Sequence, residues 1–277
     1  MGLRINTNVT SLAAQRTLGQ NNMEQASTLN KLSSGTRITK ASDDAAGLAI
    51  SEKLKANIRG MQQAERNAND GISMIQVAEG GLQEVGNILI RMRELSVQSA
   101  SDTVGDKERS FTDLEYQNLK QEIERISQVT EFNGKKLLNG EGETYDFQIG
   151  IHNDDFQDRI KFDASMLNSS VGNLGVDGIA VSSKEDAQSS LSTLDEAIQK
   201  VSGQRAELGA KQNRLSSTVS NLQVSTENLS AANSRIRDTD YAAETAKNTK
   251  LNILTNAGSS VLAQSNAQGQ AALKLIG

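Results

Sequence analysis

Residues 187–215 have the sequence AQSSLSTLDEAIQKVSGQRAELGAKQNRL, in which every seventh position is apolar. The column starts at Ala187 and continues through Leu194, Val201, Leu208, Leu215, Leu222, Leu229 and Ile236. A seven-residue repeat keeps one stripe of a slightly underwound helix turned toward a partner helix. The pattern therefore predicts one coiled-coil helix over residues 184–236, which would be about 80 Å long at 1.5 Å per residue.

A companion column on the same predicted helix is half polar. Its members are Leu191, Ile198, Arg205, Gln212, Val219, Thr226 and Asn233. Polar residues in a coiled-coil seam fix the register and the number of partners at some cost in stability.

A second long helix is predicted over residues 44–98. One heptad column consists of Leu54, Met61, Ala68, Ile75, Leu82 and Leu89, and another of Ala64, Gly71, Ala78, Val85 and Met92. Ser42, Asp43 and Asp44 precede these columns and are typical of a helix N-terminus. Five glycines lie inside the segment, at 60, 71, 80, 81 and 86. Because each costs about 1 kcal/mol relative to Ala, we expect either that a partner helix supplies that energy or that close backbone approach needs the space.

A third amphipathic helix and a small β region complete the central part of the chain. The helix is predicted over residues 107–127, with an apolar face of Phe111, Leu114, Leu119, Ile123 and Ile126. Between residues 131 and 180, aromatic and aliphatic residues alternate with polar ones at Tyr145–Ile149 and at Arg159–Asp163. That period of two predicts strands, and the Asn-Gly pairs at 133–134 and 139–140 predict turns.

The two ends of the chain resemble each other. Both are rich in Asn, Gln, Ser and Ala, and both carry an excess of basic residues, whereas the segment between them is acidic. Each fits an amphipathic helix whose apolar stripe is too narrow to offset an ordering cost of about 1–2 kcal/mol per residue. We therefore expect both ends to become helical only against neighbouring copies. The residues expected to carry that assembly are Val9, Leu12, Leu18, Leu29, Leu32, Leu251, Leu254, Val261, Leu262, Leu273 and Ile276.

These patterns predict a mainly α fold, namely a long antiparallel coiled-coil-like bundle with a small β-hairpin region and terminal helices that order on assembly. Residues 1–43 and 236–277 form the two halves of a terminal domain, and residues 44–235 form the long-helix core with its β element at 131–180. The helix-to-helix seams are assigned to Leu54, Met61, Ile75, Leu82, Leu194, Val201, Leu208, Leu215, Leu222, Leu229 and Ile236.

Composition excludes several classes of function. The 277 residues have a net charge of −5 and contain no Cys, no Pro, no Trp and one His. Thiol, disulfide and Cys-based metal chemistry are therefore impossible, and the mild acidity argues against a nucleic-acid groove. His152 lies beside Asp154 and Asp155 but is expected to belong to a polar turn, so we expect no enzyme activity, metal or cofactor. No run is apolar enough for a membrane span or a secretory signal.

Several stretches resemble the signature of bacterial flagellins. They are LSSGTRITKASDDAAGLAISEKL (32–54), INTN (5–8), NDGI (69–72), RELSVQ (93–98), FNG (132–134), LSAANSRIRDTDYAAE (229–244) and AQSNAQGQ (263–270). The chain is similar to a short flagellin that lacks large outer domains. The resemblance implies a structural subunit that polymerises into the flagellar filament for motility, with paired terminal helices forming an inner tube.

The resemblance also implies partners and a location. The subunit would leave the cell unfolded through the flagellar type III export apparatus, without a cleaved signal peptide, and would become part of the extracellular flagellum. An export chaperone would bind the C-terminal end, and the filament would grow beneath a cap and join hook-associated junction proteins. Leu89, Arg91, Leu95 and Glu115 match positions through which a Toll-like flagellin receptor of a host recognises free subunits.

Alternatives remain open at this point. A hook–filament junction protein of the same apparatus would have similar ends, and an intracellular coiled-coil scaffold would explain the heptads alone. An organellar transit peptide or a membrane-surface helix at the N-terminus would not explain the matching C-terminus. Three matches to the Asn-X-Ser/Thr glycan acceptor, at Asn8, Asn168 and Asn228, are weak in a chain so rich in Asn and Ser.

Overall fold

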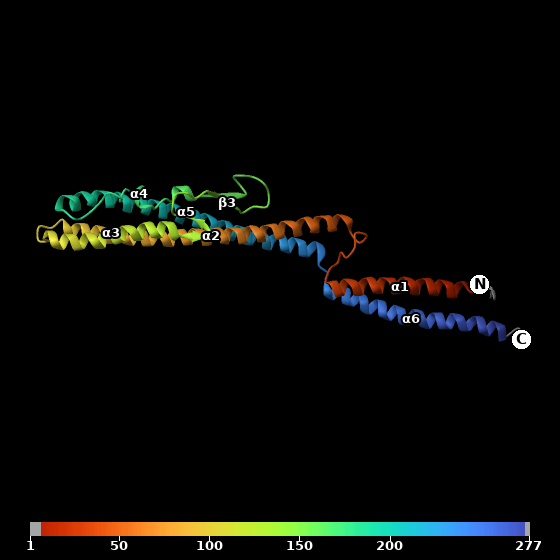
Figure 1. The fold of residues 1–277 in the computed structure, drawn as a ribbon. Coiled ribbons are helices and arrows are strands. Elements are labelled where there is room, and N and C mark those ends of the chain that lie inside the picture. The colour runs from red at the N-terminus through yellow and green to blue at the C-terminus, as the bar shows by residue number, and fades with distance from the viewer. Residues whose placement is uncertain (1–6, 275–277) are drawn as a thin grey trace. The chain divides into compact units, whose positions relative to one another are not determined.

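The computed structural model describes residues 7–274, with side chains over 7–267, and shows the long helices that the heptad columns predict (Figure 1). Six α-helices occupy most of the described chain: α1 (Val9–Ser34), α2 (Ala45–Ser99), α3 (Asp106–Val129), α4 (Val171–Leu174), α5 (Lys184–Arg237) and α6 (Tyr241–Lys274). A single 3-10 turn, η1, spans Ala164–Met166.

Two antiparallel hairpins lie between α3 and α4. One pairs β1 (Glu131–Phe132) with β2 (Lys135–Lys136), and the other pairs β3 (Thr144–Gln148) with β4 (Arg159–Asp163). The predicted turn at Asn133-Gly134 is confirmed, because both residues adopt positive φ angles, of 50° and 76°. In the second hairpin Tyr145 lies opposite Phe162, and the two rings stack at 6.3 Å.

The chain divides into two compact units. The terminal unit comprises residues 1–56 and 228–277, and the central unit comprises residues 57–227. Each contains one end of both α2 and α5, since both long helices cross the boundary. The two units are described separately below.

The core of the central unit is the heptad seam that the sequence predicts. Ile75, Leu82 and Leu89 of α2 and Leu194, Val201, Leu208 and Leu215 of α5 are at most 2% exposed. The second predicted column of α2, from Ala64 to Met92, is buried as well. These seams therefore join helices of the same chain. The outer seam positions Leu54, Met61, Leu222, Leu229 and Ile236 are half-buried.

Glycines in α2 make room for the β region, as the helix's composition predicts. The ring of Phe147 packs on Gly71, where an added Cβ would come within 3.1 Å of the ring, and Ile151 packs on Gly60 in the same way. Asn67 reinforces this contact by donating from Nδ2 to the carbonyl of Gln148 at 3.0 Å. The β3–β4 hairpin is thus held against one stretch of α2.

The predicted apolar face of α3 is partly wrong. Phe111 and Leu114 are 70% and 64% exposed, whereas the buried face runs through Arg109, Tyr116 and Ile123 at intervals of seven. Arg109 is buried because its guanidinium donates to the carbonyls of Ser99 and Ser101 and pairs with Asp106 at 2.8 Å. The spacing of apolar residues alone does not predict this buried face, because the face includes Arg109 and Tyr116.

Candidate assembly surfaces

In the terminal unit, α1 and α6 run side by side as an antiparallel pair (Figure 1). The positions of α1 that face α6 alternate three and four apart, which is coiled-coil spacing. They are Ser11, Ala14, Leu18, Asn21, Gln25, Thr28 and Leu32, and the corresponding positions of α6 are Glu244, Asn248, Leu251, Thr255, Gly258, Leu262 and Ser265. Polar and small residues dominate both lists, so this seam has few large apolar contacts.

Hydrogen bonds hold the far end of the pair together. Asn8 caps α1 by accepting from the amide of Ser11 at 3.1 Å, and its Nδ2 donates to the carbonyl of Ser265 at 2.9 Å. Ser11 donates to Asn266 at 2.8 Å, and Gln25 donates to Asn252 nearer the middle. Specific polar contacts therefore set the register of the pair.

Other polar atoms in this seam have no partner. The hydroxyl oxygens of Thr28 and Thr255, the amide oxygen of Asn248 and one carboxylate oxygen of Glu244 are buried without a hydrogen bond. Each buried and unsatisfied polar group costs about 1–3 kcal/mol. The pair of helices is therefore weak when it stands alone.

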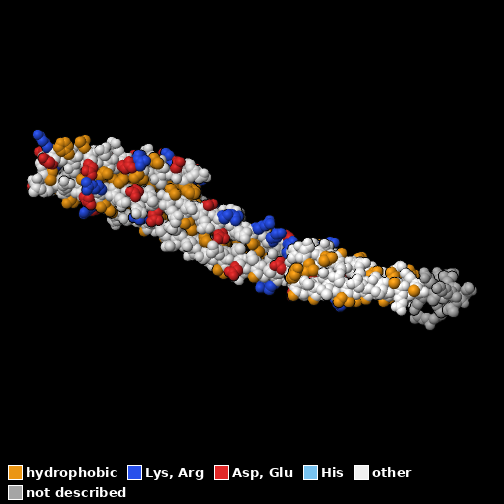
Figure 2. Space-filling model, turned by 90° about the horizontal axis from the view of Figure 1, so that it is seen from below, with side chains coloured by type: hydrophobic (Ala, Val, Ile, Leu, Met, Phe, Trp, Pro, Cys, Tyr) orange, Lys and Arg blue, Asp and Glu red, His pale blue; other side chains and the backbone are white. Residues whose placement is uncertain are grey.

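The large apolar side chains of the pair point away from the seam. Val9, Leu12, Met23 and Leu29 of α1 are 49–68% exposed. On α6, Tyr241, Ile253 and Val261 are 57–68% exposed. Figure 2 shows orange hydrophobic side chains scattered among the white atoms of the backbone and of other side chains, with few charges, in the region that leads to the grey residues. These seven exposed side chains are large apolar groups of the pair that a neighbouring molecule could contact, although they do not form one continuous patch.

The predicted assembly residues divide between the two faces. Leu18, Leu32, Leu251 and Leu262 lie in the intramolecular seam, while Val9, Leu12, Leu29, Leu254 and Val261 lie outside it. The side chains of Leu273 and Ile276 fall outside the described residues. The predicted residues thus lie on α1 and α6, but on two different faces of the pair, which the sequence does not separate.

The connectors at the base of the pair are bonded to each other. The amide of Arg37 donates to the carbonyl of Arg237 at 2.6 Å, and the amide of Thr239 donates to the carbonyl of Gly35 at 3.0 Å. Arg237 also pairs with Glu52 near the start of α2. The carboxylate of Asp43 accepts hydrogen bonds from the amide of Lys40 and from the amide and the hydroxyl of Thr39. These hydrogen bonds lower the pKa of Asp43.

The central unit has a separate exposed face on α2 and α3. Arg91 donates from Nε and Nη2 to Oε1 of Glu115, both at 3.0 Å, and from Nη1 to Glu94. These hydrogen bonds raise the pKa of Arg91, that to Glu94 most. Leu89 and Leu95 lie in the core beneath, at 0% and 2% exposed. The four residues singled out by resemblance are therefore close together, but only the charged ones reach the surface.

Over the described residues no group of three His, Asp or Glu side chains is arranged to hold a metal ion. His152 belongs to a turn, where its amide donates to Asp158. None of the helices in the described part of the chain is both long and apolar enough to cross a bilayer.

Comparison with known proteins decides between the alternatives. A family model described as the bacterial flagellin N-terminal helical region matches residues 5–143, and one for the bacterial flagellin C-terminal helical region matches 191–276. The chain belongs to the bacterial flagellin family. Flagellin of Halalkalibacterium halodurans is 45% identical over 272 residues, covering 98% of this chain and 99% of that protein.

Two further relatives agree with this assignment. The flagellar filament 33 kDa core protein of Treponema phagedenis is 44% identical over 285 residues, or 98% of this chain and 99% of that one. The crystal structure of Bacillus cereus flagellin covers 61% of this chain and 94% of its own, with a TM-score of 0.51 and 29% identity. The chain is thus a short flagellin, a structural subunit of the flagellar filament. The family is one of structural proteins and not of enzymes.

Proposed function

We propose that the subunit polymerises through the outward apolar residues of α1 and α6, and that this pair becomes firmly helical only among copies of itself. The observation that supports this is that polar side chains of the pair face inward, whereas several of its large apolar side chains face outward. Its own seam contains Thr28, Asn248 and Thr255 with unsatisfied oxygens, whereas Val9, Leu12 and Ile253 face outward. A pair built in this way is poorly stabilised alone and well supplied with apolar surface for neighbours.

The magnitudes are consistent with assembly. Burying one large aliphatic or aromatic side chain contributes about 1.5–3 kcal/mol. The eight outward residues are Val9, Leu12, Met23, Leu29, Tyr241, Ile253, Leu254 and Val261. Because they are already partly buried, at 40–68% exposed, their complete burial would contribute on the order of 7–14 kcal/mol toward association. Copies added head to tail by contacts that do not close give a helical filament instead of a ring.

Truncation tests the proposal. Deleting residues 1–36 or 242–277 should abolish filament growth while the far-ultraviolet circular dichroism of the long helices persists. Electron microscopy of seeded reactions reports growth, and a truncated chain that still elongates would contradict the proposal. Amide exchange on the dilute intact subunit gives a second test, since firm protection throughout α1 and α6 would contradict ordering on assembly.

We also propose that the subunit is exported unfolded through the flagellar type III apparatus and functions outside the cell. Absence of proline supports this, because no prolyl isomerisation would delay refolding after export. An export chaperone would cover the exposed apolar residues of α6, and the filament cap and hook-associated junction proteins would contact the subunit during growth. Intact-mass measurement of filament subunits tests for the absence of a cleaved signal peptide, and pull-down with a peptide of residues 242–277 tests the chaperone.

A second candidate function is recognition of the free subunit by a Toll-like flagellin receptor. Arg91 and Glu115 support it, since both side chains are about half exposed and hold each other in a fixed orientation. Leu89 and Leu95 are buried and would act by positioning the backbone of α2 beneath the charged pair. Direct contact therefore falls to Arg91 and Glu115.

A further inference from the structure

Two methionines of the described chain are open to solvent. Met23 of α1 is 68% exposed, and Met166 of η1 is 60% exposed. The other methionines among the described residues lie in α2, where they are buried or half-buried. Susceptibility of a side chain to oxidation follows its exposure, so an oxidant in water reaches the thioethers of Met23 and Met166 first.

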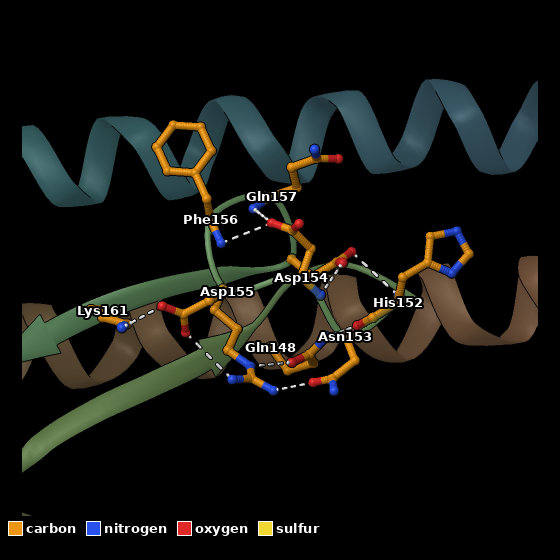
Figure 3. A network of polar contacts seen from close by, with 10 residues as sticks. Gln148, His152, Asn153, Asp154, Asp155, Phe156, Gln157 and Lys161 are labelled. Atoms are coloured by element: carbon orange, nitrogen blue, oxygen red, sulfur yellow. Dashed lines mark hydrogen bonds and ion pairs between the residues drawn. The ribbon is translucent and has the colours of Figure 1, made fainter.

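These two thioethers are also the groups that mild oxidants attack most readily in this chain. Cysteine and tryptophan are both absent, so neither a thiol nor an indole competes for the oxidant. The single imidazole belongs to His152 in the β3–β4 loop, and Figure 3 shows its ring outside the network of contacts that orders this loop. Hydrogen peroxide leaves imidazole intact when a chelator removes transition metals. Oxidation of the free subunit therefore concentrates on Met23 and Met166.

Met23 lies on the outward face of α1 together with other large apolar residues. Val9 and Leu12 are three residues apart, and Met23 follows Leu12 after eleven residues, or about three turns, so all three share one side of the helix. Gly19 and Ala26, about one turn to either side of Met23, are small. No atom lies within 4 Å of a Cβ added at Gly19. The thioether of Met23 is therefore little covered by its own helix.

Oxidation would change the polarity of this face. The sulfur lone pair attacks one peroxide oxygen, the O–O bond breaks, and the leaving hydroxide takes a proton, so the products are a sulfoxide and water. A sulfoxide oxygen is a strong hydrogen-bond acceptor, whereas a thioether is a weak one. Burying that oxygen among apolar side chains carries a desolvation cost that the thioether lacks. A subunit oxidised at Met23 would therefore pack poorly against neighbours that cover this face.

We propose that Met23 is an oxidation site through which peroxides block addition of the free subunit to the filament. The inference rests on the proposed function, in which the outward face of α1 is buried among copies of the chain. It adds a covalent modification that reaches only the free subunit. Methionine sulfoxide reductases reverse it, because they oxidise a dithiol to a disulfide while the sulfoxide oxygen leaves as water.

Partition of a partly oxidised pool tests the proposal on the unsubstituted chain. Dilute subunits are treated with hydrogen peroxide and a metal chelator until Met23 is partly converted, then freed of peroxide and grown on seeds. Filaments are sedimented, and peptide mass spectrometry measures the sulfoxide content at Met23 and Met166 in pellet and supernatant. We expect the Met23 sulfoxide to be depleted from filaments roughly tenfold, because burial of its oxygen is penalised. The Met166 sulfoxide should divide evenly.

Two results of this partition would overturn the proposal. One is an equal content of Met23 sulfoxide in filaments and supernatant. The other is equal depletion of the Met23 and Met166 sulfoxides, which would indicate general damage by the oxidant. Failure of untreated subunits to grow on seeds would instead contradict the proposed function.

Leucine variants give an independent measure, since Leu is close to Met in volume and cannot form a sulfoxide. Each variant is compared with its own untreated sample. Peroxide should slow the elongation of Met166→Leu as much as that of the unsubstituted chain, and it should not slow that of Met23→Leu. Reductases for both sulfoxide epimers should restore growth of the oxidised chain. Slowing of Met23→Leu by peroxide, or growth that stays lost after both sulfoxides are reduced, would also overturn the assignment.

Discussion

The side chain of Leu138 lies directly over Gly81 of α2, where an added Cβ would come within 2.7 Å of its Cδ1. Thr130 crowds the same point, with Oγ1 at 2.8 Å from that position. Gly80, the preceding residue, has no atom within 4 Å of an added Cβ. Adjacent glycines in one helix therefore have opposite structural roles.

This contrast predicts that alanine substitutions at the two glycines change the free energy of unfolding in opposite directions. Gly80→Ala should stabilise the subunit by about 0.5–1 kcal/mol, because Ala favours the helix and meets no obstacle. Gly81→Ala should destabilise it by about 1–2 kcal/mol, since the buried Leu138 must move. Denaturant unfolding of the two variants measures the difference, and equal effects would show that Leu138 yields without cost.

Comparing the alanine variants of Arg91 and Arg93 tests whether Arg91 takes part in receptor recognition. We expect Arg91→Ala to reduce the response of a flagellin-receptor reporter cell to soluble subunits at least tenfold. Arg93→Ala should have little effect, because Arg93 pairs with Asp195 of α5 instead of Glu115. Thermal unfolding of both variants provides the control for folding. A full response to Arg91→Ala would reject the assignment.

Leu95→Ala should behave differently from Arg91→Ala. Leu95 is 2% exposed, so its truncation should cost about 2–5 kcal/mol of stability through loss of packing. Any loss of receptor response should then follow the fraction of unfolded protein. A loss of response at unchanged stability would show direct contact instead.

The burial of Tyr116 predicts that the free energy of unfolding falls at alkaline pH. Burial among the three helices raises the pKa of Tyr116 to about 12, although the hydroxyls of Ser96 and Ser190 partly oppose the shift. Because the folded-state pKa lies above the unfolded value near 10, the neutral phenol stabilises the fold fully below pH 10. We expect roughly 1–2 kcal/mol of this stability to be lost as the pH rises from 10 to 12.

The control for this pH dependence is Tyr116→Phe, which cannot ionise. The unfolding free energy of the Tyr116 protein should fall by roughly 1–2 kcal/mol relative to that of Tyr116→Phe between pH 10 and 12, and the absorbance difference between the two native proteins should show tyrosinate only at the upper end of that range. Parallel curves from pH 9 to 12 would exclude a contribution from Tyr116.

The weakness of the α1–α6 pair can be tested by repairing its seam. Thr28 is 1% exposed and its hydroxyl has no partner, so Thr28→Val removes an unsatisfied group without changing the side chain's shape. The helicity of the isolated subunit should rise, with a gain of about 1 kcal/mol. Thr17→Val is a matched control, because Thr17 is exposed and donates to the carbonyl of Ala13. A loss of helicity in Thr28→Val would contradict the interpretation.

Heptad spacing predicts much of the central unit because it reports burial directly. Columns through Ile75 and Leu208 are buried as expected, since a seven-residue apolar repeat has one physical solution in a long helix. The strands at Tyr145 and Phe162 follow from period-two alternation in the same way. Both signals are local, and both were confirmed.

Burial that depends on polar contacts was not predicted. Ser96 and Ser190 are fully buried because their hydroxyls bond to each other and to carbonyls of their own helices, which no hydrophobic pattern records. The inner seam of α1 was missed for a related reason, since residues such as Ser11 and Thr28 face α6 while Val9 does not. A search for three-four spacing regardless of polarity could have found it.

The bonds between Arg37 and Arg237 and between Gly35 and Thr239 link two points about 200 residues apart in the sequence. A pull on either α1 or α6 therefore passes into both connectors at once. In a rotating filament under torque, this arrangement would share mechanical load between the two ends of every subunit.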